Sequence, residues 1–177
     1  MDYIVRPLSP DDSFEEITAL LHRAYGELAQ MGFRYMATHQ GPEITRERCE
    51  SGQCLIVRAP PPGPLLVSEN QEGELIGTIT FYDASRTRGC EWYDRPEVSS
   101  FGQFAVEPTL QRSGIGARLI CEVEELARIS RSGEIALDTA EGATHLIDLY
   151  KRRGYREVGI ADWNETNYKS MILSKSL

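Results

Sequence analysis

Hydrophobic and polar residues recur along the first part of the chain at the spacings that strands and helices require. Segment 3–8 alternates and is β-branched, which predicts a first strand. Ser9 followed by Pro10 is a helix-start signal, and the apolar residues of 14–28 then recur at helical spacing. We therefore expect a strand followed by one long helix that Gly32 closes.

The same periodicities continue to the end of the chain. A short second helix is expected over 41–52, with Pro42 near its start and Gly52 at its end. One apolar face predicts a helix from Ile115 to Ala127, and another helix is expected over 143–154. The remaining strands are expected over 54–59, 65–69, 74–83, 99–108, 134–139, 155–160 and 167–175, with a hairpin turn over 70–73.

This order of elements indicates the class of fold. Two helices follow the first strand, several antiparallel-type strands come next, and a β-α-β-α-β-β series completes the chain. Such an order is typical of an α/β or α+β domain with a mixed sheet. The length fits a single domain over 1–177, with no internal repeat, and 84–98 is the longest irregular segment.

Composition narrows the class of protein. Apolar residues at 41% and charged residues at 26% are typical of a soluble globular protein. The net charge of −8 argues against nucleic-acid binding and is mildly compatible with cationic substrates such as amines. The sequence shows no signal peptide, no membrane-spanning apolar run and no metal-site cysteine spacing. We therefore expect a cytoplasmic protein with reduced thiols, no membrane association and no metal.

The segment 111–119 carries the clearest chemical signal. Gly114 and Gly116 stand where a strand gives way to a helix, and unpaired N–H groups at a helix start form an anion site for phosphate. The P-loop pattern is absent, and the dinucleotide fingerprint fails because Leu119 occupies its third glycine position. The pattern that does fit is Q-x-x-G-x-G/A. The alternative is a plain strand-to-helix turn.

Together, Gln111, Gly114 and Gly116 resemble motif A of the GNAT superfamily N-acetyltransferases. A second element, LYKRRGY at 149–155, is similar to the family's L-Y-x-x-x-G-F/Y element. The resemblance is specific over roughly 99–160. It implies a GNAT-like mixed, largely antiparallel twisted sheet of about seven strands flanked by about four helices.

The resemblance also implies a cofactor site for acetyl-CoA. Backbone N–H groups would hold the pyrophosphate, and the edge of the preceding strand would pair with the pantetheine arm. The implied residues are Phe104, Ala105, Val106, Gln111, Arg112, Ser113, Gly114, Ile115, Gly116 and Ala117. Many members have an asparagine where this chain has Ala143, so that contact is lost or replaced here.

The family's reaction needs an amine that has lost its proton, a donor to the thioester oxygen, and a proton for the leaving thiolate. By the resemblance, Tyr150 is the general acid and the backbone amide near Val106 the oxyanion donor; a plain core role is the alternative for Tyr150. Asp138 matches a catalytic carboxylate of some members, although it could equally cap a turn. Gln103 stands where other members place a glutamate, and an amide cannot act as a base, so a water relay is the open alternative. Glu107 is better explained as a solvated loop carboxylate.

The acceptor is expected to be a primary amine of a small molecule or a peptide. In the family, acceptor specificity lies in variable loops, here about 30–50, 84–98 and 162–167. Dimerisation is common in the family, so a homodimer is also expected. Two other functions stay open, a catalytically silent acyl-CoA-binding domain and a nucleotide-phosphate binder. The acceptor-site candidates are Phe33, Tyr35, His39, Trp92 and Tyr93, for which plain packing is the alternative.

Overall fold

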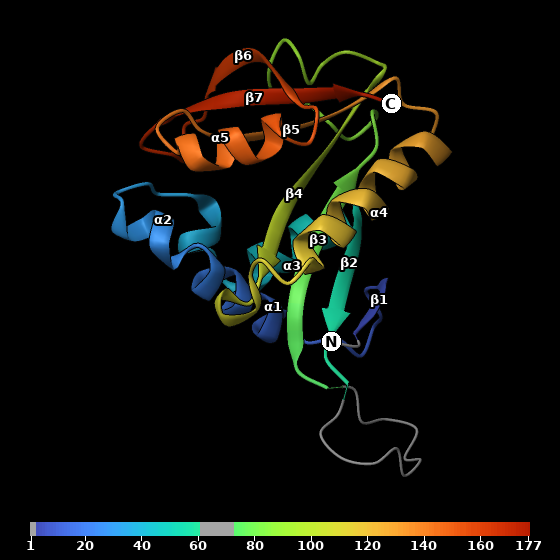
Figure 1. The fold of residues 1–177 in the computed structure, drawn as a ribbon, viewed down its shortest axis with the longest axis vertical. Coiled ribbons are helices and arrows are strands. Elements are labelled where there is room, and N and C mark those ends of the chain that lie inside the picture. The colour runs from blue at the N-terminus through green and yellow to red at the C-terminus, as the bar shows by residue number, and fades with distance from the viewer. Residues whose placement is uncertain (1–2, 61–72) are drawn as a thin grey trace.

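The computed structural model describes residues 3–60 and 73–177, which form one sheet with helices on both faces (Figure 1). The strands are β1 (Ile4–Pro7), β2 (Gln53–Arg58), β3 (Leu75–Tyr82), β4 (Val98–Val106), β5 (Glu134–Ala140), β6 (Arg156–Asp162) and β7 (Lys169–Ser176). The α-helices are α1 (Phe14–Ala24), α2 (Gly26–Gln30), α3 (Pro42–Glu50), α4 (Ile115–Ile129) and α5 (Thr144–Lys151). Two short 3-10 helices are η1 (Met36–Thr38) and η2 (Pro108–Leu110).

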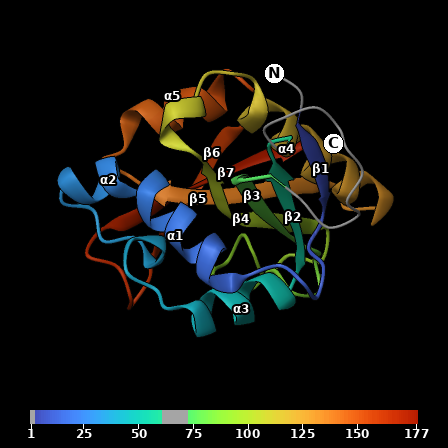
Figure 2. The same cartoon turned by 90° about the horizontal axis from the view of Figure 1, so that it is seen from below.

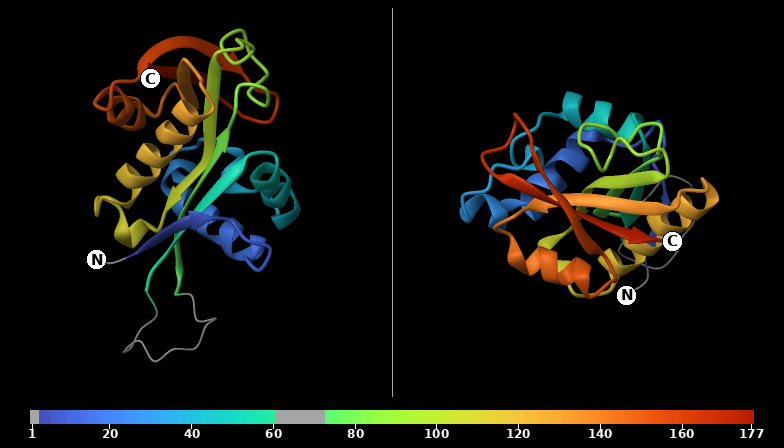
Figure 3. Two further views of the ribbon diagram at one scale, coloured as in Figure 1. Left: turned by 90° about the vertical axis from the view of Figure 1, so that its right-hand side faces the viewer. Right: turned by 90° about the horizontal axis from the view of Figure 1, so that it is seen from above.

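The sheet is mixed and largely antiparallel, as the sequence predicts. Its strand order is β1-β2-β3-β4-β5-β7-β6, and only the β4–β5 pair is parallel. Two helices, α4 and α5, cover one face, and α1 and α3 cover the other (Figure 2). The left view of Figure 3 shows the same layers from the side. The described residues form seven strands, the number that the family resemblance implies, whereas the sequence pattern predicts an eighth over 65–69. They form one α-helix more than expected, because the first predicted helix is divided.

The apolar faces predicted from periodicity form the core. On α4, Ile115, Leu119, Ile120, Val123 and Ala127 are buried against the sheet, as expected. On the opposite face, apolar residues of α1 pack against β2, β3 and β4 in a second cluster. Burial of this apolar surface is the main favourable contribution to folding.

The predicted start of the first helix is wrong. The helix begins at Phe14, and Ser13 is its N-cap, with its side chain accepting a hydrogen bond from the backbone N–H of Glu16. Ser9 instead lies in a turn, where its backbone N–H donates to Asp12 at 2.7 Å. The helix also stops earlier than predicted, at Ala24, and Tyr25 separates it from α2, which begins at Gly26.

Other predicted segments agree with the structure to within a few residues. The expected helix over 41–52 corresponds to α3, and the irregular segment 84–98 lies outside helices and strands until β4 begins. The expected strand over 65–69 and most of the turn over 70–73 lie outside the described residues. Among the helices that the structure describes, none has both the length and the apolar character needed to cross a membrane.

The sheet opens between β4 and β5. The two strands pair only from Val98 to Ser100, opposite Glu134 to Ala136. Beyond Ser100, β4 continues along β3 while β5 turns away with β7 (Figure 1). The edge of β4 that faces β5 is therefore free of strand pairing over its second half. An extended ligand can add to such an edge through main-chain hydrogen bonds.

Candidate active site

The segment between β4 and α4 presents a row of unpaired backbone donors. Gly114 caps α4 in the left-handed region, at φ 96°, and Arg112 also has a positive φ of 64°. Among the described residues, no acceptor pairs with the backbone N–H groups from Arg112 to Ala117; the first helical bond runs from Arg118 to the Gly114 carbonyl. Unpaired N–H groups at the positive end of a helix dipole have the character that anion binding requires, as the sequence predicts for this segment.

The second glycine of the motif has a different physical role. A Cβ atom placed on Gly116 would lie 3.1 Å from Cζ of Phe104 and 3.6 Å from Cγ2 of Val106. The first turn of α4 therefore approaches β4 too closely for a larger residue without movement of Phe104. By contrast, a Cβ on Gly114 would meet only open space, so its positive φ is what requires glycine there.

Tyr150 lies on α5 and faces the opening between the strands. Its side chain packs against Phe101 and Tyr155, with ring centroids 6.3 Å and 5.8 Å away, and only 6% of the residue is exposed. Burial raises the pKa of its phenol well above the usual value, so it remains protonated at neutral pH. No described residue makes a hydrogen bond with its hydroxyl.

Asp138 lies within β5, on the opposite side of the opening from β4. Its Oδ1 accepts a hydrogen bond from Tyr93 at 3.2 Å. Its Oδ2 accepts from the indole N–H of Trp163 at 3.1 Å and from the hydroxyl of Ser170 at 2.9 Å. These contacts show that Asp138 caps neither a turn nor the next helix. A carboxylate has about four acceptor sites, so roughly one remains for a ligand.

A cavity of about 1000 Å³ brings most of these groups together. It extends from the start of α4, along β4, to the gap between α2 and β5. Two of the predicted cofactor residues, Ser113 and Ile115, do not line it. The Ile115 side chain is buried in the core and the Ser113 hydroxyl donates to the Leu110 carbonyl, so their predicted contribution is limited to the backbone N–H groups. The predicted residues that line it are Phe104, Ala105, Val106, Gln111, Arg112, Gly114, Gly116, Ala117, Asp138 and Tyr150.

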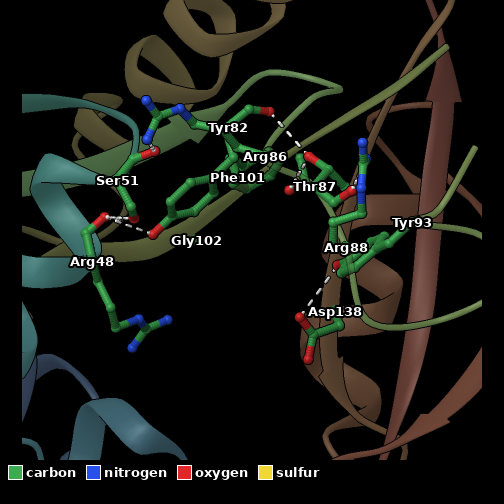
Figure 4. Close-up of a pocket in the computed structure, with 11 residues that line it drawn as sticks. Arg48, Ser51, Tyr82, Arg86, Thr87, Arg88, Tyr93, Phe101, Gly102 and Asp138 are labelled. Carbon is green, nitrogen blue, oxygen red and sulfur yellow. Dashed lines mark hydrogen bonds between the residues drawn. The ribbon is translucent and has the colours of Figure 1, made fainter. Parts of the chain in front are cut away.

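A second cavity of about 500 Å³ adjoins the first. Both are lined by Arg48, Phe101, Gly102 and Asp138, so the opening continues across the sheet from one side of β4 to the other. Figure 4 shows the smaller cavity between α3, the 84–98 segment and β5. All three loop segments that the sequence assigns to the acceptor contribute to one cavity or the other.

The individual acceptor candidates separate into two groups. Tyr35 and Tyr93 line a cavity, and Tyr35 also hydrogen-bonds Thr139 at 2.8 Å. Phe33, His39 and Trp92 line neither cavity. The residues that sequence reasoning missed are Arg48, Arg86, Arg88, Trp163, Glu165 and Thr166, whose only signal was their place in the three variable loops.

Gln103 occupies a bulge in β4 and is turned toward α3. Its backbone has φ 48°, and the β3–β4 register shifts opposite it. The side chain is 2% exposed; its Oε1 accepts from Gln40 at 2.8 Å and its Nε2 lies 3.2 Å from Sγ of Cys49. In turn, Oε1 of Gln40 accepts from the Arg48 guanidinium at 2.6 Å. Gln103 is thus a structural link to Arg48.

Two further positions weighed in the sequence have structural explanations. Glu107 pairs with Arg23, whose Nε donates to it at 2.9 Å, so this carboxylate is engaged away from the cavities. Ala143 is fully buried before α5, in a cluster with Leu28 and Tyr35. Within the described residues, no group of three or more histidine, cysteine or acidic residues can hold a metal ion.

Comparison with known sequences identifies relatives of the chain. A sequence model described as the acetyltransferase (GNAT) family matches residues 17–155. The S-(2-succino)cysteine N-acetyltransferase of Bacillus subtilis (strain 168) is 26% identical over 160 residues, which cover 88% of this chain and 86% of that protein. The family match over residues 17–155 therefore spans β4, the glycine loop and α5, which contribute most of the residues that line the larger cavity.

Comparison with solved structures supports the fold. PH1933 from Pyrococcus horikoshii OT3 has a TM-score of 0.73 at 14% sequence identity, over 99% of each chain. A GNAT family acetyltransferase from Elizabethkingia anophelis, solved with acetyl-CoA bound, has a TM-score of 0.63 at 16% identity. That match covers 99% of this chain and 98% of the other. At these identities the likeness concerns the fold, and it agrees with the GNAT-like sheet predicted from the sequence.

Proposed function

Because the chain belongs to the GNAT acetyltransferase family, we propose that it transfers an acetyl group from acetyl-CoA to the nitrogen of a primary amine. The observation that supports this most directly is the larger cavity. It joins a row of unpaired backbone N–H groups, an unpaired strand edge and the buried phenol of Tyr150. The relative that holds acetyl-CoA supports the same co-substrate.

The proposed cofactor site follows from the geometry of β4 and α4. The N–H groups from Arg112 to Ala117 bind the pyrophosphate, and the free edge of β4 from Phe104 to Val106 pairs with the pantetheine arm. This arrangement directs the thioester toward the point where the strands separate, near Tyr150. The backbone amide near Val106 is the proposed donor to the thioester oxygen.

The proposed reaction is direct attack by the amine. An alkyl ammonium of pKa about 10.4 first loses a proton, which Asp138 accepts directly or through water. The nitrogen lone pair then forms a bond to the thioester carbon. As the carbon–sulfur bond breaks, the acylated nitrogen loses its second proton to solvent and becomes a neutral amide. Tyr150 donates a proton to the departing thiolate and regains one from solvent. The products are an N-acetylated amine, coenzyme A with a free thiol, and one proton.

A catalytically silent acyl-CoA-binding domain is the second candidate function. It is favoured by Gln103, which offers no carboxylate on β4 and whose amide is engaged with α3. Such a domain would bind acetyl-CoA as well as an enzyme does, but would release no thiol on addition of an amine. Binding and turnover therefore need separate measurements.

Binding is measured first, by calorimetric titration with acetyl-CoA. We expect binding by the unmodified protein and its loss in Gly114→Glu, because a carboxylate at a left-handed position both strains the loop and repels phosphate. No binding by the unmodified protein would refute the whole proposal. Competition by coenzyme A, but not by ATP or NAD, separates this site from a general nucleotide-phosphate binder.

Turnover is then followed as thiol release in the presence of amines. The substrate named for the Bacillus subtilis relative, S-(2-succino)cysteine, belongs in this panel with amino acids, polyamines and peptides. With a substrate found, Tyr150→Phe should lower kcat about 10²- to 10⁴-fold while acetyl-CoA binding persists. Tyr3→Phe, the same change outside both cavities, is the control. Binding without turnover for any amine would favour the silent domain.

Two broader expectations remain proposals. A homodimer is expected by analogy with the family, and light scattering on the purified protein measures it. A cytoplasmic location is also expected, and fractionation of the source cells tests it.

A further inference from the structure

Positive charge gathers around the smaller cavity of a protein whose net charge is −8. Its lining includes the three arginines Arg48, Arg86 and Arg88, but Asp138 is the one acidic residue among the described residues that line it. The neighbouring Asp83 accepts hydrogen bonds from the backbone N–H and hydroxyl of Ser85, and its carboxylate also interacts electrostatically with Arg86. The local charge around this cavity is therefore opposite to that of the whole chain.

Arg48 is held in place without a carboxylate partner among the described residues. Its Nη1 donates to Oε1 of Gln40 at 2.6 Å, and Nε2 of Gln40 donates to Gln103 at 2.8 Å and to Thr45 at 2.7 Å. The backbone of Arg48 is fixed as well, because the hydroxyl of Tyr82 donates to its carbonyl at 3.0 Å. Arg48 is a half-buried residue whose guanidinium makes one hydrogen bond with the described residues, so its other N–H donors are able to receive an anion.

The other two arginines lie at the exposed rim of this cavity and are oriented by main-chain carbonyls. Arg86 donates to the Ser51 carbonyl at 2.7 Å, and Arg88 donates to those of Ala84 at 2.5 Å and Thr87 at 2.6 Å. No described carboxylate forms an ion pair with either of them. The charge of Arg86 acts partly on the neighbouring Asp83. Both guanidinium groups nevertheless stay at the exposed entrance, where they attract anions and repel polyamines.

The positions of Arg48 and Asp138 relate these charges to the proposed reaction. Figure 4 shows the two side chains reaching from α3 and β5 toward the same end of the cavity. Both residues also line the larger cavity that contains Tyr150. An acceptor held between them would place its ammonium group near Asp138 and an anionic group near Arg48. Its amine would then lie where the smaller cavity joins the larger one, which holds the proposed thioester site.

We propose that the acceptor is an amine that bears carboxylate groups, and that Arg48 is the residue that selects it. The inference rests on the proposed function. Arg48 binds the carboxylate nearer to the reacting amine through its planar fork of donors, and Arg86 and Arg88 bind a more distant one. Asp138 faces the amine. Polyamines and neutral amines are poor acceptors, because they leave the arginines unpaired.

The test compares matched acceptors that differ in one charge. Glutamate, aspartate and S-carboxymethylcysteine are compared with their α-amides and side-chain amides, with O-phosphoserine amide and with spermidine. We expect kcat/KM to fall about 10- to 100-fold when the carboxylate nearer the amine is amidated. The loss on removal of the second carboxylate should be about 2- to 5-fold and should shrink at high salt. Equal rates for acids and amides, or a preference for the phosphorylated amide or spermidine, would overturn the proposal.

The role of Arg48 is tested with Arg48→Gln and with Arg46→Gln as the control. Arg46 lies on the same helix and is exposed, so the change in charge is the same. We expect Arg48→Gln to raise KM for the acidic acceptor about 10- to 100-fold, with kcat and the KM for acetyl-CoA changed less than about 3-fold. It should also remove the preference for acid over amide. Arg46→Gln should retain the KM for the acidic acceptor and the preference for acid over amide. An unchanged preference in Arg48→Gln would refute the assignment.

Failure of this proposal and failure of the proposed function give different results. If neutral amines are acetylated as fast as acidic ones, the proposed acetyltransferase activity holds and the proposed preference for an acidic acceptor is refuted. If no amine is acetylated, N-acetylglutamate is titrated into the protein saturated with coenzyme A. Binding that Arg48→Gln weakens about 10-fold or more supports the anion site without turnover. No difference between the unmodified protein and Arg48→Gln refutes the site.

Discussion

Replacing Gln103 by glutamate tests whether a carboxylate on β4 would help or harm this protein. The family resemblance places a glutamate at this position, which suggests that Gln103→Glu would supply a missing base. The structure predicts the opposite result. The amide Nε2 lies 3.2 Å from Sγ of Cys49 and 3.5 Å from the Thr45 carbonyl, so a carboxylate oxygen would face another acceptor there. The hydrogen bond with Cys54, together with burial, raises the pKa of the Cys49 thiol, so this thiol stays protonated and is only a weak donor.

The size of the effect follows from these contacts. Gln103→Glu keeps the hydrogen bond from Gln40 but loses the two that the amide Nε2 donates to Thr45 and Cys49. It also places a carboxylate at a position that is only 2% exposed. An unsatisfied buried polar group costs about 1–3 kcal/mol, and more when it is charged, so we expect a loss of about 3 kcal/mol at neutral pH. For a chain of this length that corresponds to a fall in Tm of about 6–12 °C.

Thermal unfolding at pH 5 and pH 8, together with kcat, measures the effect. Burial should raise the pKa of the new carboxyl above its unfolded value, so the variant loses stability as pH rises through the folded pKa. The Tm difference from the unmodified protein should therefore be larger at pH 8 than at pH 5. Gln53→Glu, the same change at an exposed position on β2, should leave Tm unchanged. A higher kcat with an unchanged Tm in Gln103→Glu would refute the reasoning.

Two further changes test other parts of the structure. Gly116→Val would place a Cβ atom within 3.1 Å of Phe104, so calorimetry should show weaker acetyl-CoA binding, and unfolding should show a loss of stability of about 1–3 kcal/mol. Gly159→Val, where the added side chain meets open space, should show neither effect. Equal effects in the two variants would contradict the close approach of α4 to β4. Burial alone would raise the pKa of Asp12, but the hydrogen bonds that its carboxylate accepts, the strongest from Arg6, outweigh this effect. The net result is a pKa well below the usual value. Asp12→Asn should therefore cost about 3 kcal/mol in urea unfolding at pH 7. This difference should shrink below about pH 4, where the contribution of a carboxylate with a lowered pKa is lost, and a constant difference would contradict the ion pairs.

Local signals in the sequence were enough to predict the half of the fold that carries the glycine loop. The apolar spacing from Ile115 to Ala127 corresponds to the buried face of α4, because a helix packed on a sheet buries one continuous stripe. The strand before it and the turn at Gly114 also depend mainly on neighbouring residues. The anion-binding character of this segment was therefore visible without the structure.

Features that depend on distant contacts could not be predicted. Ser9 and Pro10 resemble a helix start, but Asp12 is engaged by Arg6 and Arg58, and this holds residues 9–12 in a turn. Arg48 resembles any surface arginine of a polar helix. Its position in the cavity depends on Gln40, eight residues away in sequence, and on a bulge in β4 that no local pattern indicates.

The bulge and the opening of the sheet explain why the acidic residue that lines both cavities, Asp138, comes from β5 and not from β4. Pairing of β4 with β5 ends at Ser100, and the left-handed backbone at Gln103 follows three residues later. The first feature frees the edge of β4, while the second turns a side chain away from that edge and into α3. A carboxylate on β4 would therefore lie under α3, whereas Asp138 on β5 is held by three donors at the junction of both cavities. The same bulge holds Gln40 and, through it, Arg48 opposite Asp138. With glutamine instead of the glutamate that the family resemblance places here, this part of β4 supports Arg48 through Gln40 rather than offering a carboxylate. This support is what the proposed anion site at Arg48 requires.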